Sequence, residues 1–315
     1  MERGLDIGVD VAKDAVVVAC SQASFASRSI PNRSAALKGW LATLPAGSRI
    51  GVESTGEYHE LIAELACARG LQVFVLNARD LRHYARALGL RGKTDRVDAQ
   101  LIARYVAGEK ARLMAWIAPT PEQRQIHRLL RRRAKIARAK ATLTQSLRCD
   151  YTLAKELTAL KSNIEAMLVK LDAKIAALVQ ASPQRKTICE QVSTIHGFGP
   201  LLGSYLAALF ERIRFANGDA FVAFTGFDLR ANDSGNKVGR RRLSKRGPAE
   251  LRRLLFLAAM NWAKTDYGRA LYQRYRQRGL SKTAALVVLA RKLARIAYSL
   301  QKQGTTFDRA RLAHA

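Results

Sequence analysis

Short apolar segments and amphipathic segments alternate over residues 4–77, and this order restricts the fold more than any other feature. The stretch "GLDIGVDVAKD" at 4–14 starts the series, because its apolar residues alternate with other residues as in a half-buried strand. The pattern predicts helices at 32–44 and 57–70, and strands at 4–10, 14–20, 24–30, 49–54 and 71–77. Consecutive short strands form an antiparallel meander, whereas strands separated by helices pair in parallel. Residues 1–108 are therefore expected to form an α/β domain with a meander at its front.

A large excess of basic residues indicates a polyanionic partner. Lys and Arg number 54 against 25 Asp and Glu, which gives a net charge of +29. Nucleic acid is the first candidate and a membrane surface the second. Apolar runs such as "AALVVLA" at 284–290 are too short to span a bilayer, and no signal peptide precedes the first strand. A cytoplasmic protein without a membrane partner is therefore expected.

Residues 119–183 are expected to form a basic helix followed by a second long helix. Nine Lys or Arg and no acidic residue occur between Arg124 and Arg148. Leu and Ile then recur at spacings of three and four from Leu153 to Leu178, until Pro183 ends the helix. This spacing predicts a helical hairpin arm or coiled coil and favours a homo-oligomer, although a core-facing helix in a monomer gives a similar pattern. The candidate nucleic-acid contacts of the basic helix are Arg131, Arg132, Arg133, Lys135, Arg138 and Lys140.

Residues 187–310 are expected to form a second, mainly helical domain. Its sequence "TIHGFGPLLGSYLAALF" contains a turn of helix-hairpin-helix type, in which Gly197 and Gly199 would let the backbone approach a phosphate. Two long helices are predicted farther along the chain, at 249–277 and 281–303.

Four carboxylates stand where they could converge on one edge of the predicted sheet. Asp10 and Glu53 end predicted strands, while Asp95 and Asp98 begin a predicted helix three residues apart and so share one side of it. Converging carboxylates repel one another unless a cation lies between them, and hard oxygen ligands suit Mg²⁺ or Mn²⁺. Asp10 could instead begin a turn, and Asp95 and Asp98 could simply interact favourably with the helix dipole. Asp6, in the same predicted strand, is the alternative to Asp10 in this set of carboxylates.

Several motifs resemble the insertion-sequence-110 family of DEDD transposases, in order along nearly the whole chain. "IGVDVAKD", "VESTGEY" and "RGKTDRVDA" are similar to motifs of that family's RuvC-like first domain, of RNase H fold. "TIHGFGPLLGSYLAALF", "FVAFTGF" and "NDSGNKVGRRRLSKRG" are similar to its second, Tnp domain. The resemblance implies a RuvC-like domain over 1–108, a helical or coiled-coil segment over 119–183 and a Tnp domain over 187–310. It also implies a catalytic, metal-binding tetrad of Asp10, Glu53, Asp95 and Asp98.

The resemblance places the family's nucleophilic serine on Ser234, within "NDSGN". The same letters are also a plain turn sequence, and a serine hydroxyl is a poor nucleophile until a metal or carboxylate activates it. Basic residues that could hold a scissile phosphate follow the serine: Lys237, Arg240, Arg241, Arg242, Lys245 and Arg246. The composite sites of the family imply that the serine and the tetrad meet across the interface of a dimer or tetramer. Two departures from the family's pattern are His196, where proline is common, and a basic segment one residue shorter.

The leading hypothesis is a transposase or recombinase that cuts and rejoins DNA through a covalent phosphoserine. The resemblance further implies a noncoding guide RNA that pairs with target and donor DNA. One alternative is a RuvC-like hydrolytic nuclease or resolvase that uses water. The other is a non-enzymatic nucleic-acid-binding protein, which would explain the charge but not the four carboxylates. A sugar kinase shares "DIGVD" at 6–10, but no glycine-rich phosphate loop follows.

Overall fold

The computed structural model describes residues 4–22, 26–54, 56–90, 92, 94–149, 152–230, 239 and 241–312, with no side chains for 311 and 312. The chain divides into two compact units, Met1–Ala118 and Pro119–Ala315. A further division of the second unit between 183 and 187 remains a prediction. No helix in the described ranges is long and apolar enough to cross a membrane.

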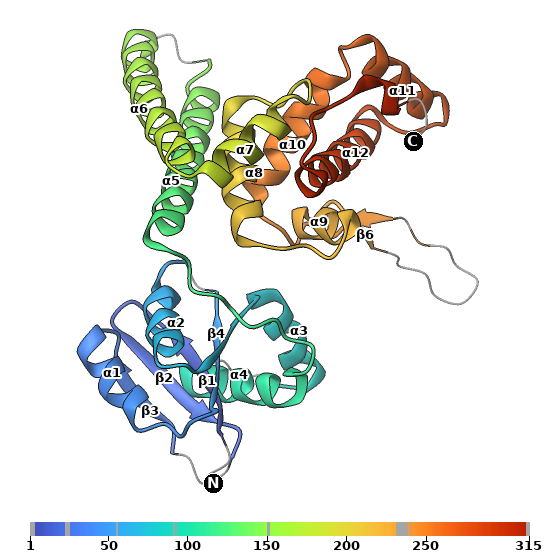
Figure 1. Ribbon diagram of the computed structural model, residues 1–315. Helices are drawn as coiled ribbons and strands as arrows, with labels where there is room; N and C mark the ends of the chain where they lie inside the picture. Colours follow the sequence, from blue (N-terminus) through green and yellow to red (C-terminus); the bar gives the residue numbers. More distant parts are fainter. Residues whose placement is uncertain are drawn as a thin grey trace. The chain divides into compact units, whose positions relative to one another are not determined.

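A five-stranded mixed sheet forms the centre of the first unit (Figure 1). Its strands are β1 (Asp6–Val11), β2 (Ala15–Cys20), β3 (Arg28–Pro31), β4 (Arg49–Glu53) and β5 (Gln72–Leu76). They stand in the order β3-β2-β1-β4-β5, with β1, β2 and β3 antiparallel and with β4 parallel to both β1 and β5. The predicted meander and the predicted parallel pairing are confirmed.

Helices cover both faces of this sheet. The helices of the unit are α1 (Ser34–Ala42), α2 (Tyr58–Ala68), α3 (Ala78–Ala87) and α4 (Asp95–Glu109). Ile7, Val9 and Val11 alternate along β1 and share one hydrophobic core with α1 and α2. Residues of β5, α3 and α4 form the second core, so α4 lies on the opposite face of the sheet.

Two glycines let α4 lie directly against the sheet. A Cβ atom added to Gly8 of β1 would stand 2.1 Å from the carbonyl oxygen of Ala99 and 2.3 Å from the backbone nitrogen of Ala103. A Cβ atom on Gly51 of β4 would stand 2.4 Å from Cγ2 of Val106. Any side chain at either position would push α4 away from the strands, so these glycines determine how closely the helix approaches the candidate carboxylates.

The second unit is almost entirely helical. Its elements are α5 (Pro121–Ser146), α6 (Ala154–Gln180), α7 (Pro183–Ser193), α8 (Pro200–Arg212), α9 (Gly218–Thr225), β6 (Leu229–Arg230), β7 (Arg242–Leu243), α10 (Ala249–Trp262), α11 (Asp266–Gln277) and α12 (Lys282–Gln303), followed by a 3₁₀ turn at Arg309–Leu312. One hydrophobic core, with Phe221, Trp262 and Leu293 fully buried, joins α7 through α10 and α12. The chain is thus a mixed α/β unit followed by a mostly helical one.

The helices α5 and α6 form the predicted hairpin arm. At its base Ile126 and Leu130 of α5 meet Ile175 and Val179 of α6, and this small core also contacts α8. Pairing of the arm with a second copy of the chain, as in a coiled coil, remains a prediction.

Two helix boundaries differ from the sequence-based expectation. Pro183 does not end the long helix, because α6 stops at Gln180 and Pro183 is the first residue of α7, with Ser182 as its N-cap. The helix expected at 249–277 is two helices, since Thr265 begins α11 by accepting a hydrogen bond from the backbone N–H of Gly268. Local caps at Ser182 and Thr265 therefore set these boundaries.

A largely buried carboxylate ties the arm to the core of the second unit. Glu211 of α8 accepts hydrogen bonds from Ser182 Oγ at 3.1 Å and from Gln123 Nε2 at 3.3 Å. Nε of Arg185 also lies 3.3 Å from the Glu211 carboxylate, without hydrogen-bond alignment, and Arg185 is 5% exposed. Glu211 therefore neutralises an almost fully buried guanidinium.

Replacing Glu211 with alanine is expected to lower the free energy of unfolding by about 3–5 kcal/mol, because it leaves the Arg185 charge buried without its partner. Chemical denaturation of the full chain measures the change. Glu165→Ala removes an exposed ion pair to Lys140 in the same unit and should leave stability almost unchanged. Equal effects of the two substitutions would contradict the role assigned to Glu211.

Candidate functional site

Asp10 and Glu53 lie side by side near the carboxyl ends of adjacent parallel strands. The register pairs Val9 of β1 with Val52 of β4, so Asp10 and Glu53 are the next residues along the two strands. Because side chains alternate along a strand, both carboxylates lie on the same face as the two glycines that contact α4. Both side chains are partly exposed. The first half of the predicted tetrad is thus adjacent in space.

The other two carboxylates begin α4, and the direction of this helix brings them to the same end of the sheet. Thr94 caps α4 by accepting a hydrogen bond from the Val97 backbone N–H at 3.3 Å, with Asp95 and Asp98 in the first turn. The helix then crosses β1 at residues 99–103, and just beyond its end Nζ of Lys110 lies 3.5 Å from a carboxylate oxygen at the start of β1. Because the end of α4 lies near the first residue of β1, the start of α4 must lie near the carboxyl end of β1. All four acidic residues are therefore at one end of the sheet.

Asp6, the rival of Asp10, lies at the opposite end of β1 and has structural partners. It is 8% exposed and accepts a short hydrogen bond from Nε of Arg49 besides its ion pair with Lys110. This hydrogen bond, followed by the Coulomb attraction of the same carboxylate, raises the pKa of Arg49 against the opposing effect of burial. The placement of Asp6 therefore favours Asp10 as the tetrad member.

The four side chains do not form a ready-made metal site. Within the part of the chain that the structure describes, no group of three or more His, Cys, Asp or Glu could hold a metal ion. Strand register and helix direction bring the four residues to one end of the sheet, but their carboxylates do not converge on a point.

The predicted nucleophile belongs to the segment between β6 and β7. Ser234, Lys237 and Arg240 lie outside the described residues. The base of this β-hairpin is described, because Leu229 pairs with Leu243 and Arg230 with Arg242 in a short antiparallel ladder. The two strands therefore carry the serine segment from the end of α9 and return it to the start of α10.

Side-chain contacts that the sequence analysis missed fix the base of the hairpin. The buried hydroxyl of Ser244 donates a short hydrogen bond to the carboxylate of Asp228, and Nη1 of Arg252 donates to the carbonyls of Thr225 at 3.0 Å and Gly247 at 2.9 Å. Asp228 and Ser244 each stand one residue outside the paired strands. The symmetric positions of Asp228 and Ser244 about the hairpin could have predicted their contact. They become apparent, however, only when the strand pairing is known.

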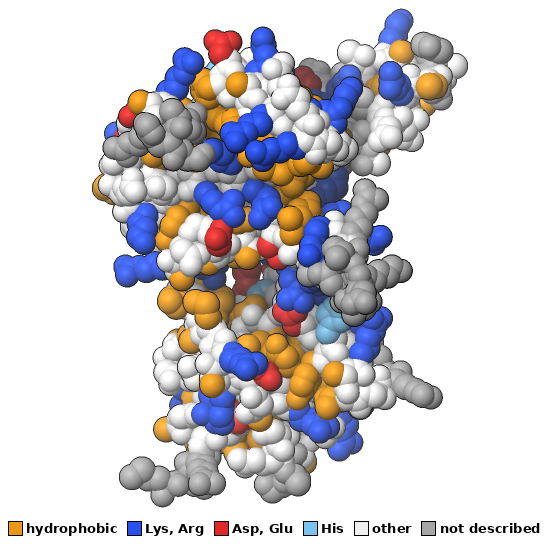
Figure 2. All heavy atoms as spheres, turned by 90° about the vertical axis from the view of Figure 1, so that its right-hand side faces the viewer, with side chains coloured by type: hydrophobic (Ala, Val, Ile, Leu, Met, Phe, Trp, Pro, Cys, Tyr) orange, Lys and Arg blue, Asp and Glu red, His pale blue; other side chains and the backbone are white. Residues whose placement is uncertain are grey.

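The described basic residues after Ser234 are open to solvent. Arg241, Arg242, Lys245 and Arg246 are exposed, and Lys245 has a φ of 53°, which is unusual for a residue with a side chain. On the face shown in Figure 2, Lys and Arg side chains are spread over the surface and acidic side chains are fewer. These residues are accessible to a phosphate backbone, and their contact with one remains a prediction.

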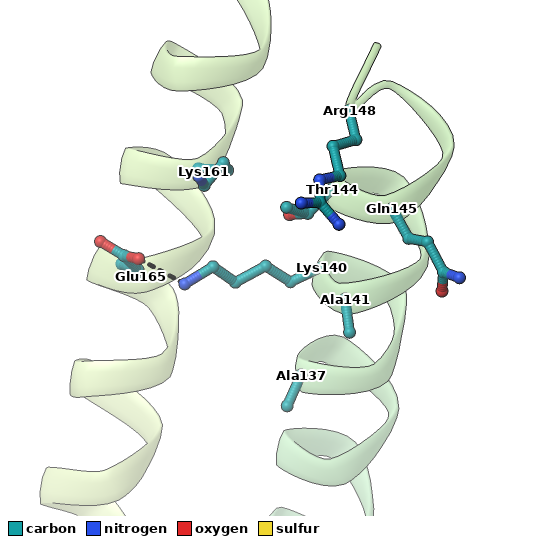
Figure 3. A pocket seen from close by; sticks show the side chains of 8 residues that line it. All are labelled: Ala137, Lys140, Ala141, Thr144, Gln145, Arg148, Lys161 and Glu165. Atoms are coloured by element: carbon teal, nitrogen blue, oxygen red, sulfur yellow. Dashed lines mark hydrogen bonds and ion pairs between the residues drawn. The ribbon is translucent and has the colours of Figure 1, made fainter.

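Part of the positive charge of the basic helix α5 is paired with acidic residues of α6. Arg133 donates from Nε and Nη2 to the carboxylate of Asp172 at 2.8 and 3.2 Å, and Lys140 pairs with Glu165. Arg132, Lys135 and Arg138 are exposed, whereas Arg131 is partly buried. An open groove of about 780 Å³ near the end of the arm is lined by Lys140, Arg148, Lys161 and Glu165 among others (Figure 3). Of the predicted contacts on α5, the exposed ones remain the best placed for nucleic acid.

The turn between α7 and α8 gives its two glycines different positions. Gly197 has a φ of 89°, and an added Cβ would lie 2.7 Å from the carbonyl oxygen of Ala258 in α10. Its lack of a side chain therefore serves packing against α10. Gly199 is exposed at the N-cap of α8, with no atom within 4 Å of an added Cβ. A phosphate contact at either glycine remains a prediction, and only Gly199 is open.

Two family models match this chain. One, described as a transposase of the DEDD IS110 type, matches residues 7–150, and the other, described as a transposase of the IS116/IS110/IS902 family, matches residues 189–273. This chain belongs to the IS110 family of transposases. The first match contains the four carboxylates of the transposase, and the second contains its β6–β7 hairpin with Ser234.

The transposase is similar to two proteins named as pilin gene-inverting proteins. The one from Moraxella bovis is 28% identical over 267 residues, which cover 82% of this chain and 81% of the relative. The one from Moraxella lacunata is 27% identical over the same length, with the same shares covered. A shorter similarity, 26% identity over 159 residues, links half of the chain to 37% of an uncharacterised 43.6 kDa protein of insertion element IS110 from Streptomyces coelicolor. The transposase is thus an enzyme of DNA recombination, and the non-enzymatic alternative is excluded.

Proposed function

We propose that this transposase cuts and rejoins DNA strands through a covalent bond between Ser234 and a DNA phosphate. A divalent ion bound by Asp10, Glu53, Asp95 and Asp98 would assist, and a noncoding RNA would select the DNA. The observation that carries the proposal is the gathering of these four carboxylates at one end of the sheet by strand register and by the direction of α4.

The first unit supports a RuvC-like domain of RNase H fold. Its sheet consists of the antiparallel meander of β1, β2 and β3 and, on the other side of β1, the parallel strands β4 and β5. The helix α4 packs across β1. In the RNase H fold, catalytic acids lie at the ends of strands and on a helix that crosses those strands. Asp10 and Glu53 lie near such strand ends, and Asp98 lies on such a helix.

The donor set fits a hard divalent cation in its chemistry and its location. Four carboxylates supply only oxygen ligands, the preference of Mg²⁺ and Mn²⁺. Because no three described side chains already form a site, binding would require the carboxylates to turn toward one another. When bound, such ions stabilise the attacking and leaving oxygens of a phosphoryl transfer.

The serine step conserves every phosphodiester bond. The Ser234 hydroxyl oxygen forms a bond to phosphorus while the bond from phosphorus to a deoxyribose oxygen breaks, and the serine proton ends on that departing oxygen. Attack by the hydroxyl of another strand on the phosphoserine reverses the exchange and releases the serine. Exposed arginines at 241, 242 and 246 are suited to offset the charge of the phosphate.

The relatives' printed names favour rejoining over hydrolysis. Two relatives similar over 82% of this chain are named for inverting a gene. Inversion of a DNA segment requires that every cut end be joined again, which a covalent intermediate achieves without an external energy source. A water-using nuclease would leave the ends open.

Guidance by RNA is compatible with the composition. A net charge of +29 with only 7% aromatic residues suits extensive contacts to sugar-phosphate backbones, as expected if base pairing by an RNA reads the sequence. Assembly of a dimer or tetramer would bring the serine of one copy to the tetrad of another. The exposed apolar residues of α6, among them Leu160 and Met167, are compatible with such an assembly.

Sequencing of the nucleic acid that co-purifies with the transposase tests the guidance. We expect a single structured RNA that maps beside the gene for the protein when nuclease inhibitors are present throughout. A random mixture of cellular RNA and DNA fragments would contradict the RNA guide and would leave an unguided recombinase.

Thermal melting tests the metal site without any DNA. Addition of Mn²⁺ at about 100 times its Kd is expected to stabilise the first unit by about 2.7 kcal/mol, seen as a higher Tm. Asp10→Asn should abolish the shift and Asp6→Asn should keep it, because only Asp10 belongs to the proposed donor set. An equal shift in the Asp10→Asn variant would place the ion elsewhere.

A further inference from the structure

A groove on the second unit combines a ligand-sized volume with positive charge. It measures about 490 Å³, within the range of about 300–1,000 Å³ typical of small-ligand sites. Its walls come from α11 and α12, chiefly Tyr275, Val288, Arg291, Lys292, Arg295 and Ile296. Three basic side chains thus line the groove together with apolar ones, on elements that the sequence-based prediction did not connect with nucleic acid.

The three basic residues are not equally neutralised. Arg295 donates from Nε at 2.7 Å and pairs from Nη2 at 2.6 Å with the carboxylate of Asp219 in α9. Arg291 is partly buried, and its Nε is fully buried with no hydrogen-bond partner among the described residues. An oxyanion in the groove would place negative charge beside the Arg291 guanidinium, whose Nε has no acceptor in the described part of its surroundings.

The electrostatic surroundings of Arg291 also favour an anion. Burial is the main cause that lowers its pKa, and the nearby charge of Arg295 lowers it further. Asp219 and Asp228 act in the opposite direction and more weakly. A bound phosphate would stabilise the charged guanidinium against both of the larger effects.

The groove lies within electrostatic reach of the base of the β6–β7 hairpin. Asp228, whose charge acts on Arg291, is the residue immediately before β6. Its carboxylate accepts the hydroxyl hydrogen bond of Ser244 at the base of the same hairpin. The base of the hairpin and the groove are thus close enough for one DNA strand to contact both.

We propose that the groove between α11 and α12 binds the phosphodiester backbone of the DNA strand that is cut, beside the scissile phosphate. Arg291 and Lys292 contact its phosphates, and Val288 and Ile296 contact its deoxyribose rings. The choice of DNA as occupant rests on the proposed function, because it follows from the position of the serine hairpin.

The test measures DNA affinity of the full-length, nuclease-treated protein by fluorescence anisotropy across a KCl series. The probe is a labelled random-sequence duplex DNA, with a single-stranded RNA of the same sequence as the second arm. Arg291→Gln combined with Lys292→Gln is expected to weaken DNA binding by about tenfold or more. The slope of log affinity against log salt should become shallower by about 0.9 for each phosphate that the variant no longer neutralises. The matched control combines Lys282→Gln with Lys302→Gln, two exposed residues of α12 outside the groove, and should stay within about twofold of wild type.

Each outcome decides the proposal. Equal DNA affinities of the groove and control variants would overturn it, and a loss confined to the RNA probe would overturn DNA as the occupant. If the double variant melts at a lower temperature than wild type, the single Lys292→Glu variant provides the same comparison by charge reversal. Binding requires no chemistry, so Ser234→Ala should bind the duplex as wild type does. Failure of the serine mechanism would thus appear in strand joining and not in this measurement.

Discussion

A Ser234→Ala variant is expected to form no covalent protein–DNA adduct and to rejoin no strands. The alanine has no oxygen to accept the phosphate, so both cutting and joining should fall by at least about a thousandfold, in line with losses of other enzyme nucleophiles. The measurement uses DNA co-purified or supplied with the guide, and a denaturing gel separates the adduct from free strands. DNA binding should remain, because the substitution removes no charge.

Ser244→Ala is the matched control for the serine assignment. Ser244 is 2% exposed and its hydroxyl is hydrogen-bonded to Asp228, so it supports the base of the hairpin and is shielded from a phosphate. We expect this variant to form the adduct more slowly but still to form it. Strand joining retained by Ser234→Ala would refute the serine mechanism, and cutting without any adduct in the wild type would favour the water-using nuclease.

Asp10→Asn is expected to reduce DNA cutting by at least about a hundredfold without loss of stability. The substitution removes one anionic ligand of the proposed ion, whose charge stabilisation amounts to several kcal/mol in comparable reactions. Asp10 is partly exposed near a strand end, so the amide should be accommodated with little change in the free energy of unfolding. Single-turnover cutting assays and chemical denaturation, run on the same preparation, measure the two quantities.

The matched control is Asp6→Asn, at the other end of the same strand. This variant weakens a largely buried contact to Arg49 and Lys110, so we expect a stability loss of about 1–3 kcal/mol with nearly normal cutting at low temperature. The reverse result, with activity lost in a folded Asp6→Asn variant and kept in Asp10→Asn, would assign the tetrad position to Asp6.

Much of the first unit could be predicted because its signals are local. Alternation identified the first strand and short apolar runs the others, and the strand–helix–strand order predicted parallel pairing of β1, β4 and β5. The break between α10 and α11 was missed although Thr265 is a local cap, because apolar residues at helical spacing resume soon after it, at Tyr267 and Leu271.

The candidate site could be predicted only in part from local sequence patterns. Spacing identified Asp95 and Asp98 as neighbours on one helix, and strand ends identified Asp10 and Glu53. The family resemblance favoured Asp10 over Asp6, and the ion pairs of Asp6 at the other end of β1 agree with that choice. The contact of Arg252 with Thr225 and the pairing of Arg133 with Asp172 join residues that are distant in the sequence. No local sequence pattern predicts such contacts.

The sequence by itself determined the order of strands and helices, the basic surface and the kinds of side chain available for chemistry, since these depend on local periodicity and residue type. Tertiary structure alone decided which of those side chains lie together. Asp10 stands beside Glu53 because β4 pairs in parallel with β1, and Asp95 and Asp98 reach the same end because Gly8 and Gly51 let α4 cross the sheet in close contact. Both arrangements arise from packing between segments about 40 to 100 residues apart, where long-range burial and backbone hydrogen bonds, rather than local preference, determine the free energy.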